Sequence, residues 1–494
     1  MFKQATTEDI NNVLQNAATA FSLYKKTNAA DKAVFLETVA NEIEALGDAL
    51  IQQAAEETNL PAPRLVGERG RTTMQLRMFA AMVREGSWVE ACIDTAIPDK
   101  VPPRPDLRKM LIPLGPIVVF GASNFPFAYS TAGGDTASAL ASGCPVIVKA
   151  HPAHAKTSEL VANAIQTAIK KCNVPAHVFQ HVHSDSFDAG KALVQHPLTA
   201  AVGFTGSYTG GKALYDYAQE RLKPIPVFSE MGSVNPVVFF PDTLEKNTAA
   251  LAKLYAGSIT LGMGQFCTNP GLMFAIESEP LTKFLQLLGE EIATVIPAKM
   301  LHSGIQKAYF EKLQKSLQQK AVELVSQSVA NADELEARAT IATVTADIFL
   351  QNPLLHEEVF GPYSLLVKCK DIAQLKQAWL AVAGQLTTSL MGTDEDFKEY
   401  TDCIETASAI AGRIVFNNVP TGVEVCPSMV HSGSFPACTD SRFTAVGINA
   451  VKRWVRPVCF QNCPSYILPA ELKNENPVGI WRLINNQFSQ QTIA

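Results

Sequence analysis

The stretch IPLGPIVVFGA, residues 112–122, is a short run of almost wholly apolar residues. Such a run is typical of a β-strand that is buried on both faces, as in a parallel sheet covered by helices. Three comparable runs follow: PVIVKA at 145–150, AHVFQHV at 176–182 and AAVGFTG at 200–206. Helical patterns separate these runs, so the sequence predicts repeated β-α-β units in a doubly wound α/β fold.

The segments on either side of this core complete the expected organisation. Residues 8–60 carry apolar side chains three or four positions apart and predict two amphipathic helices. A long helix after 242, a Gly-rich turn and a mixed stretch predict a second α/β lobe. The expected regions are 1–232, whose sheet core starts at about 111, then 233–445, and a tail at 446–494.

The composition excludes several classes of protein. Of the 494 residues, 47% are hydrophobic and 18% are charged, so there is enough apolar surface to bury a core, and disorder is excluded. The 41 Lys and Arg residues against 47 Asp and Glu give a formal net charge of −6, and no Lys/Arg-rich run is present. Binding to nucleic acid is therefore disfavoured.

The sequence also bears on location. The first residues, MFKQATTEDINNVLQ, lack the apolar core of a signal peptide, and no uninterrupted apolar stretch reaches ~18 residues. The ten cysteines stand singly, without CxxC spacing, which favours free thiols over a zinc ribbon or a disulfide framework. We expect a soluble, unexported, cytoplasmic protein that binds no membrane.

Cys267 lies in GQFCTNPG, residues 264–271, between a predicted helix and an apolar strand. The glycines leave little bulk around the thiol, and nearby backbone N–H groups favour a thiolate, so Cys267 is a candidate nucleophile. A packing cysteine in a tight turn is the alternative, and these residues alone leave both open.

Glu230 follows the apolar run PIPVF in FSEMGSVNP, residues 228–236. A carboxylate at the end of a buried strand is poorly solvated, which suits a general base that acts near neutral pH. A helix cap or a partner of a lysine is the alternative.

FTGSYTGGKAL, residues 204–214, places a Gly-rich turn between a strand and a helix, where backbone donors and the helix dipole can bind phosphate. Gly206, Gly211 and Lys212 match the P-loop pattern G-x-x-x-x-G-K, but Ala213 replaces the Ser or Thr that would hold Mg²⁺. A nucleotide hydrolase is therefore disfavoured, and a phosphate-bearing cofactor remains open.

Two histidine pairs have spacings that occur in metal sites, His151 with His154 and His181 with His183. No acidic or cysteine partner stands at ligand spacing in the sequence, so strand packing or loop exposure is favoured. We expect no metal.

In their order along the chain, these segments resemble the aldehyde dehydrogenase superfamily. PLGPIVVFGASNFPFAYS resembles its strand with an Asn-Phe-Pro turn, VIVKAHPAH its strand with the cofactor-binding lysine, and FTGS with Gly211 its nucleotide turn. SEMGSVNP stands where the family has Glu-Leu-Gly-Gly, GQFC where it has Gly-Gln-x-Cys, and EEVFGP where it has Glu-x-Phe-Gly-Pro. The resemblance covers nearly the whole chain.

The resemblance implies a reaction. Cys267 would attack an aldehyde carbon, and the Asn124 amide with the backbone N–H of Cys267 would stabilise the oxyanion. After hydride transfer to a nicotinamide, a water deprotonated by Glu230 would hydrolyse the thioester to a free acid. Relatives that pass the acyl group to coenzyme A generally lack this glutamate. His431, in MVHSGS, would lie near Cys267 as a proton acceptor or orienting group.

The resemblance also assigns the regions and the cofactor. Region 1–232 would bind NAD(P), region 233–445 would carry the cysteine, and the tail would return to the first region and to the interface of a homodimer. The residues implied to hold the cofactor are Lys149, His151, Gly206, Ser207, Gly211, Lys212, Glu358 and Phe360.

One departure favours NADP over NAD. Many NAD-preferring relatives have a glutamate three residues after the lysine, where this chain has Pro152. Without that carboxylate a 2′-phosphate meets no like charge. The side chains that could attract it are Lys149, His151, Lys156 and Lys212.

GERGRTTMQLRMFA, NVPTGVEVCPSMVHSGSFPACTD and GQFCTNPG resemble a narrower branch, the bacterial 2-oxoglutarate semialdehyde (2,5-dioxopentanoate) dehydrogenases and the related NADP-linked fatty aldehyde dehydrogenases. A dicarbonyl acid needs a cation for its carboxylate, and Arg69, Arg71 and Arg77 lie on a segment that lines the substrate tunnel in the family. A solvated helix face is the alternative for these arginines. A fatty substrate would need an apolar tunnel, for which the candidates are Phe125, Phe127, Phe266 and Phe435. We favour the dicarbonyl acid, with the fatty aldehyde as the alternative.

Overall fold

The apolar runs that predicted buried strands form a five-stranded, all-parallel sheet in the computed structural model, which describes residues 2–493. Its order is β5-β4-β3-β6-β7. The strands are β3 (Ile117–Phe120), β4 (Val146–Lys149), β5 (Phe179–Val182), β6 (Ala201–Thr205) and β7 (Val227–Glu230). The direction of winding changes between β3 and β6, which is where such a sheet binds its ligands. The doubly wound α/β fold expected from the sequence is confirmed.

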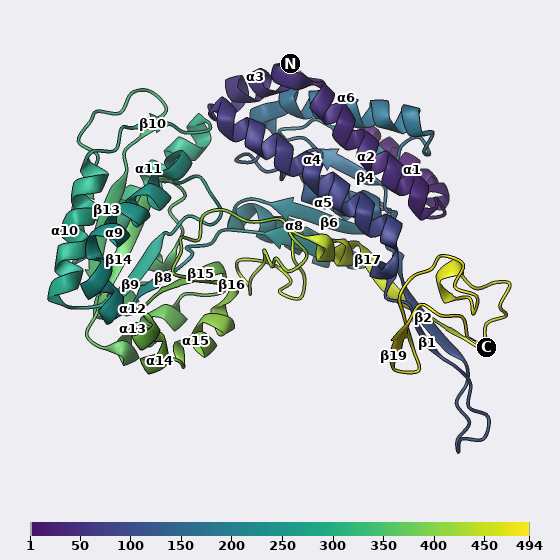
Figure 1. Ribbon diagram of the computed structural model, residues 1–494. Coiled ribbons are helices and arrows are strands. Elements are labelled where there is room, and N and C mark those ends of the chain that lie inside the picture. The colour runs from purple at the N-terminus through teal and green to yellow at the C-terminus, as the bar shows by residue number, and fades with distance from the viewer. Residues whose placement is uncertain (1, 494) are drawn as a thin grey trace.

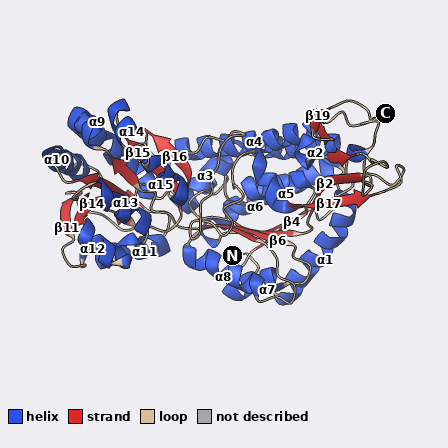
Figure 2. Cartoon of the chain, turned by 90° about the horizontal axis from the view of Figure 1, so that it is seen from below, coloured by secondary structure: helices blue, strands red, loops and turns tan. Residues whose placement is uncertain are grey.

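Helices cover both faces of this sheet (Figure 2). On one face lie α1 (Thr7–Tyr24), α7 (Phe187–Gln195) and α8 (Tyr208–Gln219). On the other lie α2 (Ala29–Ala45), α4 (Ala62–Glu85), α5 (Gly134–Ser142) and α6 (Ala155–Cys172). The expectation of two helices over residues 8–60 is wrong, because three helices form there. Gly47 adopts a left-handed φ of 57° and starts a separate helix, α3 (Gly47–Thr58).

A second sheet forms the other body of the molecule, on the left of Figure 1. Its order is β11-β13-β14-β9-β8-β15-β16, and all neighbours are parallel except β11 with β13. The strands are β8 (Val237–Phe239), β9 (Leu272–Ile276), β11 (Glu323–Gln327), β13 (Thr340–Thr345), β14 (Tyr363–Cys369), β15 (Gln385–Met391) and β16 (Ala411–Phe416). Around it lie α9 (Pro241–Thr260), α10 (Glu279–Ala293), α11 (Ser303–Leu317), α12 (Ala346–Gln351), α13 (Ile372–Ala381), α14 (Asp394–Glu399) and α15 (Cys403–Ile410).

A third sheet forms an arm that projects from the first body, at the lower right of Figure 1. Its order is β17-β2-β1-β18-β19, so the C-terminal tail pairs with a hairpin from the first part of the chain. The strands are β1 (Cys92–Asp94), β2 (Leu107–Pro113), β17 (Val455–Gln461), β18 (Arg482–Ile484) and β19 (Gln487–Ser489). The run at 112–122 is therefore divided, because its first two residues end β2. Among residues 2–493, no helix has both the length and the apolar character needed to cross a membrane.

Candidate active site

Cys267 lies in a loop that a buried asparagine and a close backbone contact hold in place. The loop connects a 3₁₀ turn, Leu261–Gly264, to β9. Gly264 has a φ of 63°, and a Cβ there would collide with the carbonyl of Gly361, so only glycine fits. The Asn235 amide donates to the carbonyls of Cys267 (2.8 Å) and Asn269 (2.9 Å). The position of the thiol is thus fixed from both sides.

Glu230 ends β7, and the segment that carries His431 runs beside this strand. A β-bridge pairs Glu230 with Cys438, seven residues beyond His431. The backbone N–H of His431 donates to the Thr444 hydroxyl (2.9 Å), which turns the imidazole toward the end of β7. The expected position of Glu230, at the end of a buried strand, is confirmed.

These elements bring the thiol, the imidazole and the carboxylate together. His431 Nε2 lies 3.6 Å from the Sγ of Cys267 and 3.1 Å from Oε1 of Glu230. His431 is 1% exposed and Glu230 4% exposed, whereas Cys267 is partly exposed. A nucleophile within reach of two proton acceptors is the arrangement that covalent catalysis requires.

The resting state of the thiol differs from the sequence-based expectation of a thiolate. Burial, and then the nearby Glu230 carboxylate, raise the pKa of Cys267 well above its usual value, and the Arg71 guanidinium only partly opposes them. Desolvation and like charge outweigh the local backbone dipoles. The thiol is therefore protonated at neutral pH, and its attack on a carbonyl requires transfer of this proton.

Asn124 lies in the loop after β3 and faces the Cys267 loop. Its side-chain amide donates to the carbonyl of Gln265 (3.3 Å), which leaves the second amide hydrogen available. The loop is held by His154, whose Nε2 lies 2.9 Å from the carbonyl of Ala122, and by Arg64, which donates to the carbonyl of Asn124 (2.7 Å). The Asn124 amide therefore contacts the backbone two positions before Cys267.

Two of the three arginines proposed for the substrate turn away from this site. Arg69 donates to the carbonyl of Gly47 at the start of α3 (2.7 Å). Arg77 forms a two-pronged pair with Glu44 at 2.6 and 2.7 Å on an exposed face. The assignment of Arg69 to the substrate is corrected, because its guanidinium is used in packing α4 against α3.

Arg71 does face the site. Its guanidinium lies over the ring of Tyr129, 5.5 Å from the ring centre, and its Nη2 lies 3.3 Å from the Tyr129 hydroxyl. Its Nε is buried without a hydrogen-bond partner among residues 2–493. It is also close enough to Cys267 to influence the pKa of the thiol. An unpaired buried donor beside a nucleophile is suited to bind a polar part of a substrate.

Sequence reasoning missed two further arginines, Arg64 on α4 and Arg413 on β16. Each has a buried guanidinium nitrogen for which the described part of the chain provides no partner. Burial lowers the pKa of both guanidinium groups, and the neighbouring Cys267 acts in the opposite direction on each. Arg64 also lies over the rings of Phe125 (5.2 Å) and Phe266 (4.6 Å). Arg64, Arg71 and Arg413 therefore all lie near Cys267, with the buried Glu68 carboxylate close to Arg64 and Arg71.

The phenylalanines proposed for an apolar tunnel separate into two groups. Phe125 and Phe266 contact each other with ring centres 5.8 Å apart and belong to one apolar cluster beside the cysteine loop. Phe127 is packed in the core between α4 and the first sheet, so its assignment to the substrate is wrong. Phe435 is 53% exposed and lies against Tyr208.

Lys149 and His151 lie at the carboxyl end of β4. Burial lowers the pKa of Lys149, while Asp185 acts to raise it. Burial and the neighbouring His154 hold the pKa of His151 well below its usual value, so this ring is neutral near pH 7. His151 Nδ1 accepts from the N–H of Ala153 (3.2 Å), which leaves Nε2 as a neutral donor. The expectation that His151 attracts a phosphate by charge is corrected accordingly.

The Gly-rich turn at the end of β6 leads into α8 as expected. Gly206 follows the strand, Ser207 caps the helix and Gly211 lies in its first turns. Lys212 forms an exposed ion pair with Asp216, with Nζ 2.7 Å from both carboxylate oxygens. The charge of Lys212 is therefore balanced by Asp216 of the same helix, and the remaining donors at this turn are the Ser207 hydroxyl and the backbone N–H groups.

Glu358 and Phe360 lie on the loop before β14, opposite the end of β7. A Cβ on Gly232 would lie 2.5 Å from a carboxylate oxygen of Glu358, so the carboxylate sits directly over this glycine. Burial raises the pKa of Glu358 to about 7, opposed by Lys312 and by the backbone of Ser233. Such a carboxylate can accept hydrogen bonds from hydroxyl groups once it is ionised.

Comparisons with known proteins identify the family of the chain. The chain matches the aldehyde dehydrogenase family over residues 1–433. It is 46% identical to alpha-ketoglutaric semialdehyde dehydrogenase 2 of Azospirillum brasilense over 484 residues, 98% of this chain and 92% of that protein. It is 43% identical to alpha-ketoglutaric semialdehyde dehydrogenase of Acinetobacter baylyi over 494 residues, 99% of this chain and 93% of that protein.

Solved structures share the fold. Glyceraldehyde-3-phosphate dehydrogenase GapN of Methanocaldococcus jannaschii, complexed with NADP, superposes with a TM-score of 0.78 at 17% identity, covering 93% of this chain and 95% of that one. NAD-dependent aldehyde dehydrogenase of Sinorhizobium meliloti superposes with a TM-score of 0.78 at 20% identity, covering 93% and 88%. The fold, the family match over most of the chain and the two relatives above 40% identity agree. The chain belongs to the aldehyde dehydrogenase family, and it is an oxidoreductase that acts on aldehydes.

Proposed function

We propose that this chain oxidises 2-oxoglutarate semialdehyde (2,5-dioxopentanoate) to 2-oxoglutarate with a nicotinamide cofactor. The observation that carries the proposal is a set of three partly buried guanidinium groups near Cys267, those of Arg64, Arg71 and Arg413. Each has one buried nitrogen that finds no hydrogen-bond partner among residues 2–493. A buried guanidinium nitrogen without a hydrogen-bond partner is costly, and an anionic substrate would supply the acceptor that this nitrogen lacks. The two relatives above 40% identity are named for the same aldehyde.

The substrate has an aldehyde at one end and a carboxylate at the other, which fits a thiol with guanidinium groups near it. The aldehyde carbon must reach the Cys267 thiol, while the carboxylate at the other end of this five-carbon acid needs a cation. Arg71 is the strongest candidate, since it is near Cys267 and its Nε has no hydrogen-bond partner in the part of the chain that the structure describes. Arg64 lies over Phe125 and Phe266, so the aromatic surface that a fatty chain would use already holds a positive charge.

The catalytic roles follow from the positions of the side chains. The Cys267 thiol passes its proton to Glu230 or His431 as the sulfur bonds to the carbonyl carbon, and the Asn124 amide donates to the resulting oxyanion. In the second half of the reaction Glu230 takes a proton from the water that cleaves the thioester. His431 contacts both groups and holds the carboxylate oriented toward the sulfur.

The residues at the strand ends fit a nicotinamide dinucleotide. The turn Gly206–Ser207 and the start of α8 would take a phosphate, Lys149 a ribose hydroxyl, and Glu358 with Phe360 the second ribose and the ring. The unusually high pKa of Glu358 supports this role, because a carboxyl that is poorly solvated in the free protein gains hydrogen bonds from ribose hydroxyls. When bound, the nicotinamide accepts the hydride released from the substrate carbon.

NADP is the preferred cofactor in this proposal. Pro152 stands where a carboxylate would repel a 2′-phosphate, and Lys149 is a nearby cation. The charge of Lys212 is paired with Asp216, and the His151 ring is neutral near pH 7, so neither adds a free positive charge. The carboxylate of Asp185, near Lys149, would repel a phosphate. The preference over NAD is therefore modest, and both cofactors should support the reaction.

A substrate panel tests the proposed function. The experiment compares kcat/KM for 2-oxoglutarate semialdehyde, other short oxo-acid aldehydes and long alkyl aldehydes, each with NADP and NAD. We expect the short acids to be preferred, and Arg71→Met to lose ~100-fold in kcat/KM for them while an uncharged aldehyde of equal length is little affected. Arg77→Met, on the same helix but paired on the surface, is the matched control. A preference for long alkyl aldehydes would overturn the substrate and support the fatty aldehyde alternative.

Assembly and location complete the proposal. We place the boundaries of the cofactor-binding, catalytic and tail regions at 1–232, 233–445 and 446–494, with the projecting arm as the contact in a homodimer in the cytoplasm. The arm exposes apolar side chains, among them Val101 and Phe488, which a second copy would cover. Light scattering on the intact chain and on a Phe488→Glu variant would show a dimer and its loss; a monomer in both would contradict the assembly.

A further inference from the structure

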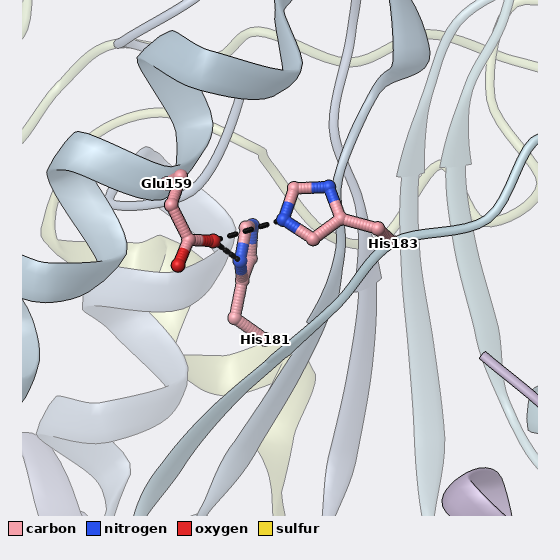
Figure 3. Close-up of side chains that lie close together, drawn as sticks. All are labelled: Glu159, His181 and His183. Atoms are coloured by element: carbon pink, nitrogen blue, oxygen red, sulfur yellow. Dashed lines mark hydrogen bonds and ion pairs between the residues drawn. The ribbon is translucent and has the colours of Figure 1, made fainter. Parts of the chain in front are cut away.

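A cluster of one glutamate and two histidines lies outside the catalytic site, between α6 and the edge strand β5 (Figure 3). Oε2 of Glu159 is 3.2 Å from Nδ1 of His181 and 2.9 Å from Nε2 of His183. The ligand-type atoms of the three side chains all lie within 4.8 Å of one another. The histidines are 7% and 13% exposed, while the glutamate is 39% exposed and faces solvent.

The fold explains why these side chains meet. His181 lies in β5 and His183 directly follows it, so residues two apart on an extended chain point to the same side. Helix α6 packs over that side and contributes Glu159, 22 residues before His181. The acidic partner that the sequence did not place near the His-x-His pair is therefore supplied by the preceding helix.

The surroundings of the histidines match those of metal ligands. Nε2 of His181 is 2.8 Å from the hydroxyl of Ser158, which in turn bonds to the hydroxyl of Thr131. A partner on the outer ring nitrogen fixes the ring orientation and leaves Nδ1 for a metal, as is usual for metal-bound histidine. On the other side, the ring of Phe2 stacks on His183 at 4.0 Å.

We propose that Glu159, His181 and His183 form a binding site for a divalent transition-metal ion of the zinc type. One carboxylate oxygen and two imidazole nitrogens are ligands that Zn²⁺ prefers, at ~2.0–2.2 Å each, and a water on the exposed side of Glu159 would complete a tetrahedron. Each ring binds the ion as a neutral imidazole, so the proton that it now donates to the carboxylate moves to its other ring nitrogen.

The protonation states support the site. The hydrogen bonds from His181 and then His183 hold the pKa of Glu159 at about 2, and burial lowers the pKa of His181. At neutral pH the carboxylate is therefore ionised and the His181 ring is neutral, which are the forms that bind metal.

The ion would join three segments of the first body. Glu159 belongs to α6, the histidines to the end of β5, and the Ala5 N–H donates to the carbonyl of His183 (2.8 Å). The N–H of Ala150 donates to the carbonyl of Val182, so this strand end also abuts the end of β4, which carries Lys149. A bound ion would thus stabilise the edge of the sheet rather than take part in aldehyde chemistry.

The experiment must exclude the catalytic cluster, because Glu230, Cys267 and His431 are also close enough to hold a metal. Full-length protein is first treated with iodoacetamide to block its thiols, then dialysed against ZnCl₂ and analysed for metal content. We expect about one zinc per chain in the wild type. Glu159→Gln and His183→Gln, which keep the size and hydrogen-bonding capacity of the side chains, should lose at least ~10-fold in zinc affinity.

His177→Asn, on the exposed loop just before β5, is the matched control and should bind zinc as the wild type does. Zinc should also raise the Tm of the wild type and of this control but not of the two cluster variants. If a variant does not fold, Co²⁺ added to alkylated wild-type protein should give visible d–d bands without a thiolate charge-transfer band. The proposal is overturned if the wild type takes up no zinc, or if the cluster variants bind it as tightly as the control.

Discussion

The Nε2 atom of His431 lies 3.1 Å from a carboxylate oxygen of Glu230, and both side chains are nearly inaccessible to solvent. The same nitrogen is 3.6 Å from the Cys267 sulfur. His431 therefore bridges the Glu230 carboxylate and the Cys267 thiol, although it lies 201 positions after Glu230 and 164 positions after Cys267 in the sequence.

This relationship predicts a defect in His431→Gln. Glutamine cannot accept and return a proton at this position, so we expect kcat to fall by about 10²-fold, in the range usual for loss of a proton-transfer group. Steady-state assays with saturating aldehyde and cofactor measure the change. His196→Gln, which changes a half-buried histidine bonded to Asn11, should leave kcat unchanged. Wild-type kcat in His431→Gln would show that the imidazole takes no part.

Removal of the Asn124 amide should slow the formation of the thiohemiacetal. Asn124→Ala loses a donor to the oxyanion, for which a decrease of about 10²- to 10³-fold in kcat is typical. The rate of the first equivalent of reduced cofactor, measured by stopped flow, should fall by the same factor. If only the later, hydrolytic phase were slower, the proposed oxyanion contact would be incorrect.

The raised pKa of Glu358 predicts that the affinity for the cofactor depends on pH. Its pKa is raised from 4.5 to about 7 in the free protein, and ribose hydroxyls bind the ionised form. Affinity should therefore weaken as the pH falls through about 7, with a proton released on binding below that pH. In Glu358→Gln the dependence should disappear. Titrations of cofactor binding between about pH 6 and about pH 8 test this, and an unchanged profile in the variant would contradict it.

The same shift affects stability in the absence of cofactor. Between about pH 4.5 and about pH 7 the folded chain binds more protons at Glu358 than the unfolded chain does, so this group lowers the free energy of unfolding as the pH rises. Glu358→Gln should remove that contribution, which urea titrations at the two ends of the range would measure.

The hydrogen bonds of Asn235 predict that its replacement lowers the stability of the protein. Its amide holds the carbonyls of Cys267 and Asn269, and its Oδ1 accepts from the hydroxyls of Ser233 and Thr387. Asn235→Ala leaves these buried groups unpaired, so we expect a loss of roughly 2–4 kcal/mol in the free energy of unfolding. Asn163→Ala, at an exposed position of α6, should change it by less than ~0.5 kcal/mol. Equal stability of the two variants would be inconsistent with the structure.

The strands could be predicted from sequence because their signals are local, and the candidate catalytic residues could be named for the same reason. The run PVIVKA forms the buried strand β4, and Cys267 and Glu230 stand in short motifs that resemble those of the family. The thiol's protonation state could not be predicted, since it depends on the distance from Cys267 to Glu230 and on burial by distant segments.

The substrate-facing residues were predicted only in part. Arg64 and Arg71 are seven residues apart, two helical turns, so helical periodicity could have found Arg64, whereas Arg69 and Arg77 fall on other faces of α4. Arg413 comes near Cys267 only through the second sheet, and no local pattern marks it. Asn235 lies in the segment SEMGSVNP, but its contacts with the Cys267 loop could not be read from that segment. Phe127 was misassigned because Phe125, two residues before it, packs with Phe266 beside the Cys267 loop, while Phe127 itself points into the core.

The central claim, that the Cys267 sulfur carries the acyl group, is tested most directly by trapping it. Glu230→Gln, mixed with aldehyde and cofactor and quenched with acid, should release about one equivalent of reduced cofactor per active site and then turn over slowly. Mass spectrometry of the digested protein should find the acyl mass on the peptide containing Cys267, and Cys267→Ala should form neither the adduct nor reduced cofactor. An adduct on another residue, or reduced cofactor formed by Cys267→Ala, would contradict the account.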